Sequence, residues 1–336
     1  MSRQGPTRQR TLENIRQFWE AEAGEIGATP RVTIRDFYFR VHELHTLLAL
    51  VPRCARLLDV GCGTGFGTLM LSKKADYCVG VDRSAGMLAW AQESKREPKY
   101  RAQLSREFGR LWDLPESDGR VVEFLQGDVA ELDLGPDPFD VLTAQRLLIN
   151  LPTREWQRRA LRRLRQHARI GSLLVLVETT EQGYGRTDAY RALFDLPPLE
   201  RYWHNLYVDE ASFDDWRLEG WSVETILSFD TYMLLSKVIY PAACGSDRCQ
   251  FLSATNAAAM ELASVFRTRS AVAEIGEATM LRAFSNRVTG YDAVEGAALE
   301  AWMARQPGAL PDWNGLGHHR IIVARAINAS GPSADR

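Results

Sequence analysis

The sequence predicts an α/β fold, a mostly parallel sheet with helices on both of its faces. Between residues 56 and 180, short apolar runs alternate with amphipathic stretches, and strands separated by helices form sheets of this kind. Four glycines at alternate positions, Gly61, Gly63, Gly65 and Gly67, directly follow the first apolar run. Glycine at this density indicates a turn whose backbone must stay bare.

The individual elements follow from the apolar periodicity. Apolar residues at three- and four-residue steps predict helices over much of residues 11–50, with a break at 24–30. Five buried strands are then expected, at residues 56–61, 77–82, 121–129, 139–149 and 171–180. The helices expected between them cover residues 66–74, 85–97 and 153–169.

The alternation of strands and helices ends near residue 181. Residues 182–220 are rich in aromatic residues and turn formers, residues 221–240 look extended, and the next long segment is mostly helical. The predicted organisation is an N-terminal helical segment (1–50), an α/β core (51–181), an inserted cover (182–220), a sixth-strand region (221–240), a helical lid insertion (241–317) and a last strand (318–328).

The composition excludes several classes of protein. With 45% hydrophobic and 25% charged residues the chain can bury a core, and its net charge of −2 favours neither nucleic acid nor an anionic membrane surface. No stretch has the apolar length of a membrane span or a signal peptide, and the five cysteines are odd in number. We therefore expect a soluble cytoplasmic protein. Cys244 and Cys249 lack a second matching pair, so no metal is expected.

The glycine-rich turn is suited to a nucleotide-like ligand, because backbone N–H groups at the positive end of a helix are presented there. The dinucleotide pattern G-x-G-x-x-G nevertheless fails from either starting glycine. Counted from Gly61 its third glycine position holds Phe66, and counted from Gly63 it holds Thr68. The Gly-Lys-Ser/Thr ending of a phosphate-binding loop is also absent. NAD and FAD are thus disfavoured.

The pattern present is Asp59-x-Gly61-x-Gly63-x-Gly65. An acid, Asp82, ends the second expected strand, Gly-Asp-Val follows the third at 127–129, and "FDVLTAQRLLINL" forms the fourth and its continuation. In this order the motifs resemble those of the class I S-adenosylmethionine-dependent methyltransferases, over residues 50 to 180 and the last strand. The resemblance implies a Rossmann-like, mostly parallel seven-stranded sheet and S-adenosylmethionine as the cofactor.

The resemblance also implies roles for individual residues. Asp82 is expected to bind the ribose hydroxyls and Asp128 to meet the adenine amino group, although either aspartate taken alone could be a helix N-cap. Asp59 is expected to orient the loop. The segment before the core resembles the lead-in of bacterial methyltransferases of surface sugars and secondary metabolites. It implies that Arg40, ahead of Arg31 and Arg35, meets the cofactor's carboxylate. The expected cofactor-binding residues are Arg40, Asp59, Gly61, Gly63, Gly65, Asp82, Arg83, Met87, Asp128, Val129 and Gln145.

Residues beyond the fifth strand are expected to meet the acceptor, because open sheets bind ligands at the carboxyl ends of their strands. His204 is the candidate general base, since an imidazole can take a proton at neutral pH, and a packed histidine is the alternative. The expected acceptor-binding residues are Glu178, Tyr184, Asn205 and Tyr207.

The expected reaction is the in-line transfer of a methyl group to an oxygen or nitrogen of a small or medium-sized acceptor, in bacterial secondary metabolism or glycan modification. The protein would mainly align the two ligands and exclude water. We expect a monomer or homodimer with no nucleic-acid or membrane partner. Two alternatives stay open, a cofactor-binding regulatory subunit without catalysis and a nicotinamide-dependent oxidoreductase.

Overall fold

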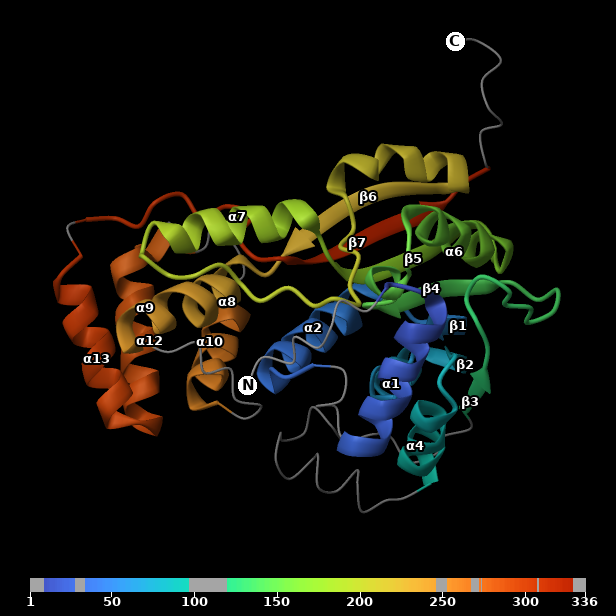
Figure 1. Cartoon of the computed structure of the whole chain (residues 1–336), viewed down its shortest axis with the longest axis horizontal. Helices are drawn as coiled ribbons and strands as arrows, with labels where there is room; N and C mark the ends of the chain where they lie inside the picture. The colour runs from blue at the N-terminus through green and yellow to red at the C-terminus, as the bar shows by residue number, and fades with distance from the viewer. Residues whose placement is uncertain are drawn as a thin grey trace, which may run out of the picture.

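The fold is built on one seven-stranded sheet. The computed structural model describes residues 9–27, 34–96, 120–245, 253–266, 272, 274–306 and 308–328. The strand order is β3-β2-β1-β4-β5-β7-β6 (Figure 1). The last strand, β7, is antiparallel to both neighbours, and the other pairs are parallel. This confirms the predicted sheet. The strands are β1 (Cys54–Val60), β2 (Ala75–Asp82), β3 (Val121–Gln126), β4 (Phe139–Gln145), β5 (Ala168–Thr179), β6 (Trp221–Ser228) and β7 (His319–Ala326).

Successive side chains of each strand pack on opposite faces of the sheet, which gives the molecule two cores. Leu57 and Val141 belong to a core on one face, and their neighbours Leu58 and Leu142 belong to the core on the other. Both faces are therefore buried, and the strands read as continuous apolar runs. The helices that follow the parallel strands are α3 (Phe66–Leu71), α4 (Ala85–Arg96), α6 (Arg154–Gln166) and α7 (Glu181–Ala192).

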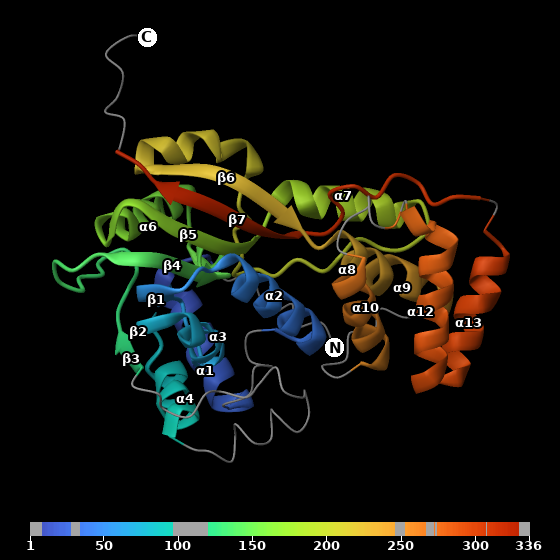
Figure 2. The same ribbon diagram turned by 180° about the vertical axis from the view of Figure 1, so that it is seen from behind.

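Two helices precede the sheet. In α1 (Leu12–Ile26) the N-cap side chain of Thr11 accepts a hydrogen bond from the Asn14 N–H, and in α2 (Phe37–Leu50) Asp36 does the same for the Phe39 N–H. Helix α1 lies along α4 in both views (Figure 1, Figure 2). Helix α2 is buried on most sides and carries Arg40 and Glu43 into the interior.

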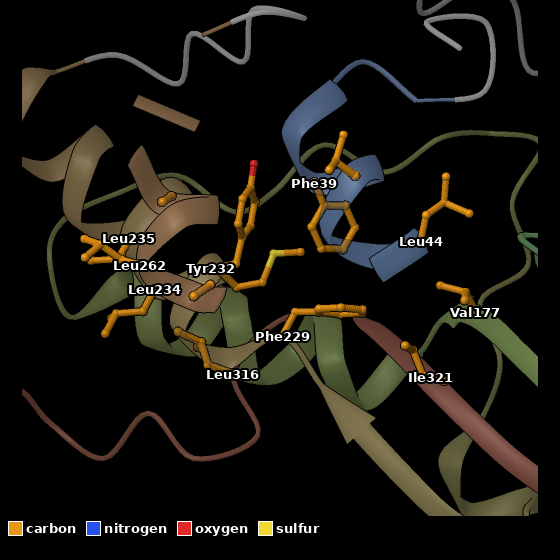
Figure 3. Packing of buried hydrophobic residues seen from close by; sticks show 14 of the residues in the cluster. Phe39, Leu44, Val177, Phe229, Tyr232, Leu234, Leu235, Leu262, Leu316 and Ile321 are labelled. Carbon is orange, nitrogen blue, oxygen red and sulfur yellow. The ribbon is translucent and has the colours of Figure 1, made fainter. Parts of the chain in front are cut away.

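A second helical layer lies beyond the end of the sheet that α2 occupies (Figure 2). It is joined to the sheet through Phe39 of α2, whose ring centroid lies 5.0 Å from that of Phe229 and 5.2 Å from that of Tyr232 (Figure 3). The layer consists of α8 (Asp230–Leu234), a π-helical turn (Leu235–Ile239), α9 (Tyr240–Cys244), α10 (Ala254–Val265), α12 (Glu277–Tyr291) and α13 (Ala293–Ala304).

Two segments differ from the sequence-based description. Strand β6 ends at Ser228 and the following residues are helical, whereas the pattern of 221–240 looks extended. From residue 229 to residue 240 every side chain except Lys237 is buried, so no polar face reveals the helical period. Residues 181–192 also form a helix, inside a segment noted for turn formers.

Candidate cofactor and acceptor site

The turn between β1 and α3 holds three glycines in the left-handed region. Gly61, Gly63 and Gly65 have φ values of +73°, +56° and +76°, which residues with a side chain adopt only at a cost. The N–H groups of Gly61 and Cys62 donate to the carbonyl of Val81 on the neighbouring strand β2. The turn is thereby fixed at the carboxyl edge of the sheet. There the connections that leave the neighbouring strands β1 and β4 run to opposite sides of the pair.

Asp82, the last residue of β2, joins its strand to this turn. One carboxylate oxygen accepts the Gly63 N–H at 2.8 Å and the other accepts the Ser84 N–H at 2.9 Å. Burial raises the pKa of Asp82, and these two backbone hydrogen bonds lower it. A carboxylate offers about four acceptor positions, so the group keeps capacity for two hydroxyl donors. That capacity fits the ribose of S-adenosylmethionine.

Arg40 enters from α2 on another side of the turn. Its guanidinium donates to the side-chain oxygen of Gln145, and one of its nitrogens lies 3.0 Å from the position that a Cβ on Gly67 would occupy. Its Nε is buried and has no hydrogen-bond partner among the described residues. Burial lowers the pKa of Arg40 to about 10, with a further contribution from Arg146. Glu43 lies 3.4 Å from another nitrogen of this guanidinium. The unused N–H group leaves Arg40 able to bind one more acceptor, and the cofactor's carboxylate fits it.

Asp59 lies beneath the turn. Its carboxylate accepts the Thr68 hydroxyl at 2.6 Å and the Thr143 hydroxyl at 2.8 Å. Burial raises its pKa and the two hydroxyl hydrogen bonds lower it. These contacts connect β1 with α3 and β4, so the side chain supports the turn from inside the fold.

The residues expected near the adenine lie together beside β2 and β3. The Arg83 guanidinium is 3.9 Å from the Asp128 carboxylate, whose other oxygen accepts the Ala130 N–H. Val129 and Met87 are buried, and Met87 packs against Ala23 of α1. Arg83 also donates to the carbonyl of Leu12 at the start of α1.

Helix α1 covers this end of the site, which the sequence alone did not indicate. The Glu20 carboxylate accepts the N–H groups of Ala85 and Gly86 at 3.0 and 3.1 Å, at the start of α4. The indole N–H of Trp90 donates to the Ala23 carbonyl at 3.1 Å. Acidic side chains are favourable at helix N-termini, so Glu20 is the polar latch between α1 and α4.

Three of the expected acceptor residues face the interior. Glu178 has no exposed surface and accepts the N–H groups of Leu148 and Ile149 at 2.8 and 3.2 Å. Burial raises the pKa of Glu178 to about 7. The rings of Tyr184 and Tyr207 are buried with their centroids 4.4 Å apart. Their acceptor-binding role stays a prediction.

His204 lies in a group of aromatic rings. Its ring stacks on Phe18 of α1 with centroids 4.2 Å apart, and Trp19 and Trp203 approach it edge-on. Burial lowers the pKa of His204 to about 4, so the ring is neutral at pH 7. Its Nδ1, like Oδ1 of Asn205, is buried without a hydrogen-bond partner among the described residues. A role as general base stays a prediction.

One buried charged group is absent from the sequence-based site. Glu43 of α2 receives both of its short contacts, 2.7 and 2.8 Å, from one nitrogen of Arg146, which follows β4. Arg146 has a positive φ of +58°, a conformation rare for residues with a side chain and concentrated at functional sites. His319 completes the group from the start of β7. In the sequence, the adjacent histidines at 318 and 319 were the feature that could have indicated this group.

No group of three metal-ligating side chains occurs among the described residues. Cys244 contacts the carbonyl of Glu295, and Cys249 and Arg31 lie outside the described residues. Within the described part of the chain, none of the helices has the length and apolar character that crossing a bilayer requires.

The glycine turn, the acid ending β2 and the strand order together define a Rossmann-like methyltransferase fold. Residues 58–176 match the family model of the methyltransferase domain, which spans β1 to β5. Over these residues the chain carries a class I S-adenosylmethionine-dependent methyltransferase domain, and S-adenosylmethionine is its methyl donor.

Several solved structures are similar to this chain at low sequence identity. A chain in the complex between the Haloferax volcanii methyltransferase activator and the putative methyltransferase is 14% identical, with a TM-score of 0.48 over 92% of this chain and 98% of that chain. The N-methyltransferase NodS from Bradyrhizobium japonicum, in complex with S-adenosyl-L-homocysteine, is 16% identical, with a TM-score of 0.45 over 64% of this chain and 89% of that chain. Magnesium protoporphyrin IX methyltransferase from Synechocystis is 19% identical, with a TM-score of 0.39 over 62% of this chain and 85% of that chain. None of the curated proteins matches the sequence significantly.

Proposed function

We propose that this methyltransferase acts on an oxygen or nitrogen of a small or medium-sized acceptor, of the kind found in secondary metabolites or glycans. The observation that carries the cofactor half of the proposal is the glycine turn with a partly unused carboxylate, Asp82, on one side and an unused guanidinium N–H, of Arg40, on another. These groups complement a ribose diol and an amino-acid carboxylate. Bound there, S-adenosylmethionine supplies an activated sulfonium methyl group.

The acceptor half is supported by what surrounds the carboxyl edge of the sheet. Helix α1 covers one end, with Trp19 bonded to Asn150 in the segment after β4. The helical layer from α8 to α13 stands beyond the other end (Figure 1). Surrounding structure of this size favours a small acceptor that can be enclosed over a macromolecular one. Enclosure matters because water must be excluded while the methyl group is transferred.

The test has two stages. Calorimetry with S-adenosylhomocysteine measures cofactor binding directly, and binding by the wild type with its loss in Gly63→Val is the expected result. The protein is then incubated with isotopically labelled S-adenosylmethionine and a panel of small hydroxyl- and amine-bearing compounds, and label transfer is followed by mass spectrometry. Wild type that does not bind S-adenosylhomocysteine would contradict the cofactor site. Binding with label transfer only to carbon or sulfur would contradict the proposed acceptor class.

A further inference from the structure

Three side chains from distant parts of the chain meet at the carboxyl edge of the sheet without a role in holding the cofactor. They are Glu43 of α2, Arg146 after β4 and His319 at the start of β7. The Glu43 carboxylate is fully buried and lies 2.7 Å from Arg146 and 3.7 Å from Nδ1 of His319. A carboxylate, a guanidinium and an imidazole in contact form an arrangement able to move a proton.

This group is adjacent to the cofactor turn. His319 pairs in register with Thr179, the last residue of β5, so its side chain stands at the strand ends where ligands bind. Glu43 is also 3.4 Å from Arg40, which bonds to Gln145 at the end of β4. One continuous chain of contacts therefore runs from the glycine turn to the imidazole.

The orientation of the ring directs one nitrogen, Nδ1, toward Glu43 and the other away from it. Nδ1 faces Glu43, but 3.7 Å is too long for a hydrogen bond, and Nδ1 has none among the described residues. Such contacts often tighten only when substrate is bound. The rings of Phe39 and His318 flank the imidazole, with centroids at 4.7 and 4.4 Å. Nε2 lies on the far side of the ring from Nδ1, and the His319 side chain is 12% exposed.

We propose that His319 takes the proton from a neutral hydroxyl or amine acceptor, while Glu43 holds Nδ1–H and stabilises the imidazolium. This rests on the proposed function and narrows its acceptor to a group that carries a proton. As the bond from the acceptor atom to the methyl carbon forms, the carbon–sulfur bond breaks and the sulfur keeps its electron pair. The acceptor proton passes to Nε2 and later leaves to water.

The charges around the ring suit a base that is neutral at rest. Burial and the cations Arg146, Lys237 and Arg320 lower the pKa of His319, so its lone pair is available at neutral pH. Glu43 from α2 opposes these cations, and His318 beside the ring has its own pKa lowered by burial. Among the described residues, no carboxylate shifts the pKa of His204. Arg10 does, and its positive charge disfavours protonation of the ring.

The first experiment needs no acceptor, and its measurement is made on the wild type. The six histidines are labelled with nitrogen-15, and long-range proton–nitrogen spectra are recorded with S-adenosylhomocysteine bound, from about pH 6 to about pH 8. Histidine-to-glutamine variants assign the signals. The expected result is a neutral His319 with its proton on Nδ1 and the lone pair on Nε2. A proton on Nε2, or a doubly protonated ring across this range, would overturn the proposal.

The second experiment uses the acceptor that the label-transfer panel identifies. His319→Gln should bind S-adenosylhomocysteine as the wild type does and lose about 10²–10⁴-fold in kcat. Glu43→Gln should move the acidic limb of the kcat/KM profile to lower pH, because removal of the carboxylate disfavours the imidazolium. His167→Gln is the matched control, since this buried histidine bonds to Leu132 at the opposite end of β5 and should leave both quantities unchanged.

Results that contradict the cofactor site can be distinguished from results that contradict only the proposed base. A wild type that fails to bind S-adenosylhomocysteine contradicts the cofactor site itself. A His319→Gln variant with normal S-adenosylhomocysteine affinity and turnover within about three-fold of wild type refutes only the base, since a general base contributes far more. If His204→Gln then shows the large loss, the base is His204. If the Glu43 variant is unfolded, the tautomer measured in the wild type still decides the question.

Discussion

Trp19 and Asn150, separated by 131 positions in the sequence, are joined by a 3.0 Å hydrogen bond from the indole nitrogen to the amide oxygen. The Asn150 amide nitrogen in turn donates to the carbonyl of Arg146. The N-terminal helix is thereby tied to the segment that follows β4, which also carries the Arg146–Glu43 pair. Helix α1 and the segment after β4 therefore form one hydrogen-bonded unit.

Loss of the Glu20 latch should loosen α1. Glu20→Ala removes two hydrogen bonds and a negative charge from the start of α4, which we expect to cost about 1–2 kcal/mol of α1 docking. Hydrogen exchange of residues 12–26 should then be about ten-fold faster, the factor that about 1.4 kcal/mol gives. S-adenosylhomocysteine should slow the same amides in the wild type. Glu13→Ala is the control, because Glu13 is exposed and bonds only within α1.

Asp82 tests the ribose contact. Asp82→Ala should weaken S-adenosylhomocysteine binding by about 1.5–3 kcal/mol, the range for hydrogen bonds to a charged group. The fold should persist, because the residue ends its strand. Asp76→Ala, at the exposed start of the same strand, should bind normally. Calorimetry with equal affinities for the two variants would remove Asp82 from the site.

Gly63 tests whether the glycine turn must lack a side chain for the cofactor to bind. Its φ of +56° is strained for a β-branched residue by about 1–2 kcal/mol, and the Gly63 N–H also holds Asp82. Gly63→Val should therefore abolish S-adenosylhomocysteine binding. Gly135→Val carries a similar strain at φ +79°, with nothing near its side chain. It should lose stability and keep cofactor affinity. Equal cofactor affinity in both valine variants would contradict the site.

Glu178 predicts a specific pH dependence of stability. Burial raises its pKa in the folded protein to about 7 from an ordinary value of 4.5, so the folded state binds the proton more tightly than the unfolded state. The contribution of this carboxyl group to stability is thus full below about pH 4.5, falls as the pH rises through about 7, and changes by about 3 kcal/mol in all. In urea unfolding, Glu178→Gln should gain relative to wild type between pH 5 and pH 8. A difference independent of pH would show that the carboxyl titrates normally.

The sheet and the cofactor turn could be predicted from sequence because their signals are local. Leu57 and Leu58 belong to a run of residues buried on both faces, and such a run followed by alternating glycines has few other interpretations. The positive φ values at Gly61, Gly63 and Gly65 agree with this interpretation.

The acceptor side could not be predicted in the same way, because its geometry depends on long-range packing. Glu178 is the next-to-last residue of β5, a position typical of an acid that binds a ligand. In the structure, however, both of its carboxylate oxygens accept backbone N–H groups from the segment after β4. Glu43, Arg146 and His319 are brought together from three separate segments. No spacing in the sequence encodes their contact.

The placement of β7 between β5 and β6 has a consequence for how the protein is made. Strand β6 pairs with β7 and β7 with β5, while β7 follows β6 in the sequence by about ninety residues. During synthesis β6 leaves the ribosome without a partner, and β5 keeps one side open until residues 319–326 emerge. Nascent chains stalled before that point expose two unpaired strand edges, the kind that nucleate aggregation and recruit chaperones. The sheet can therefore close only after residues 319–326 have been synthesised.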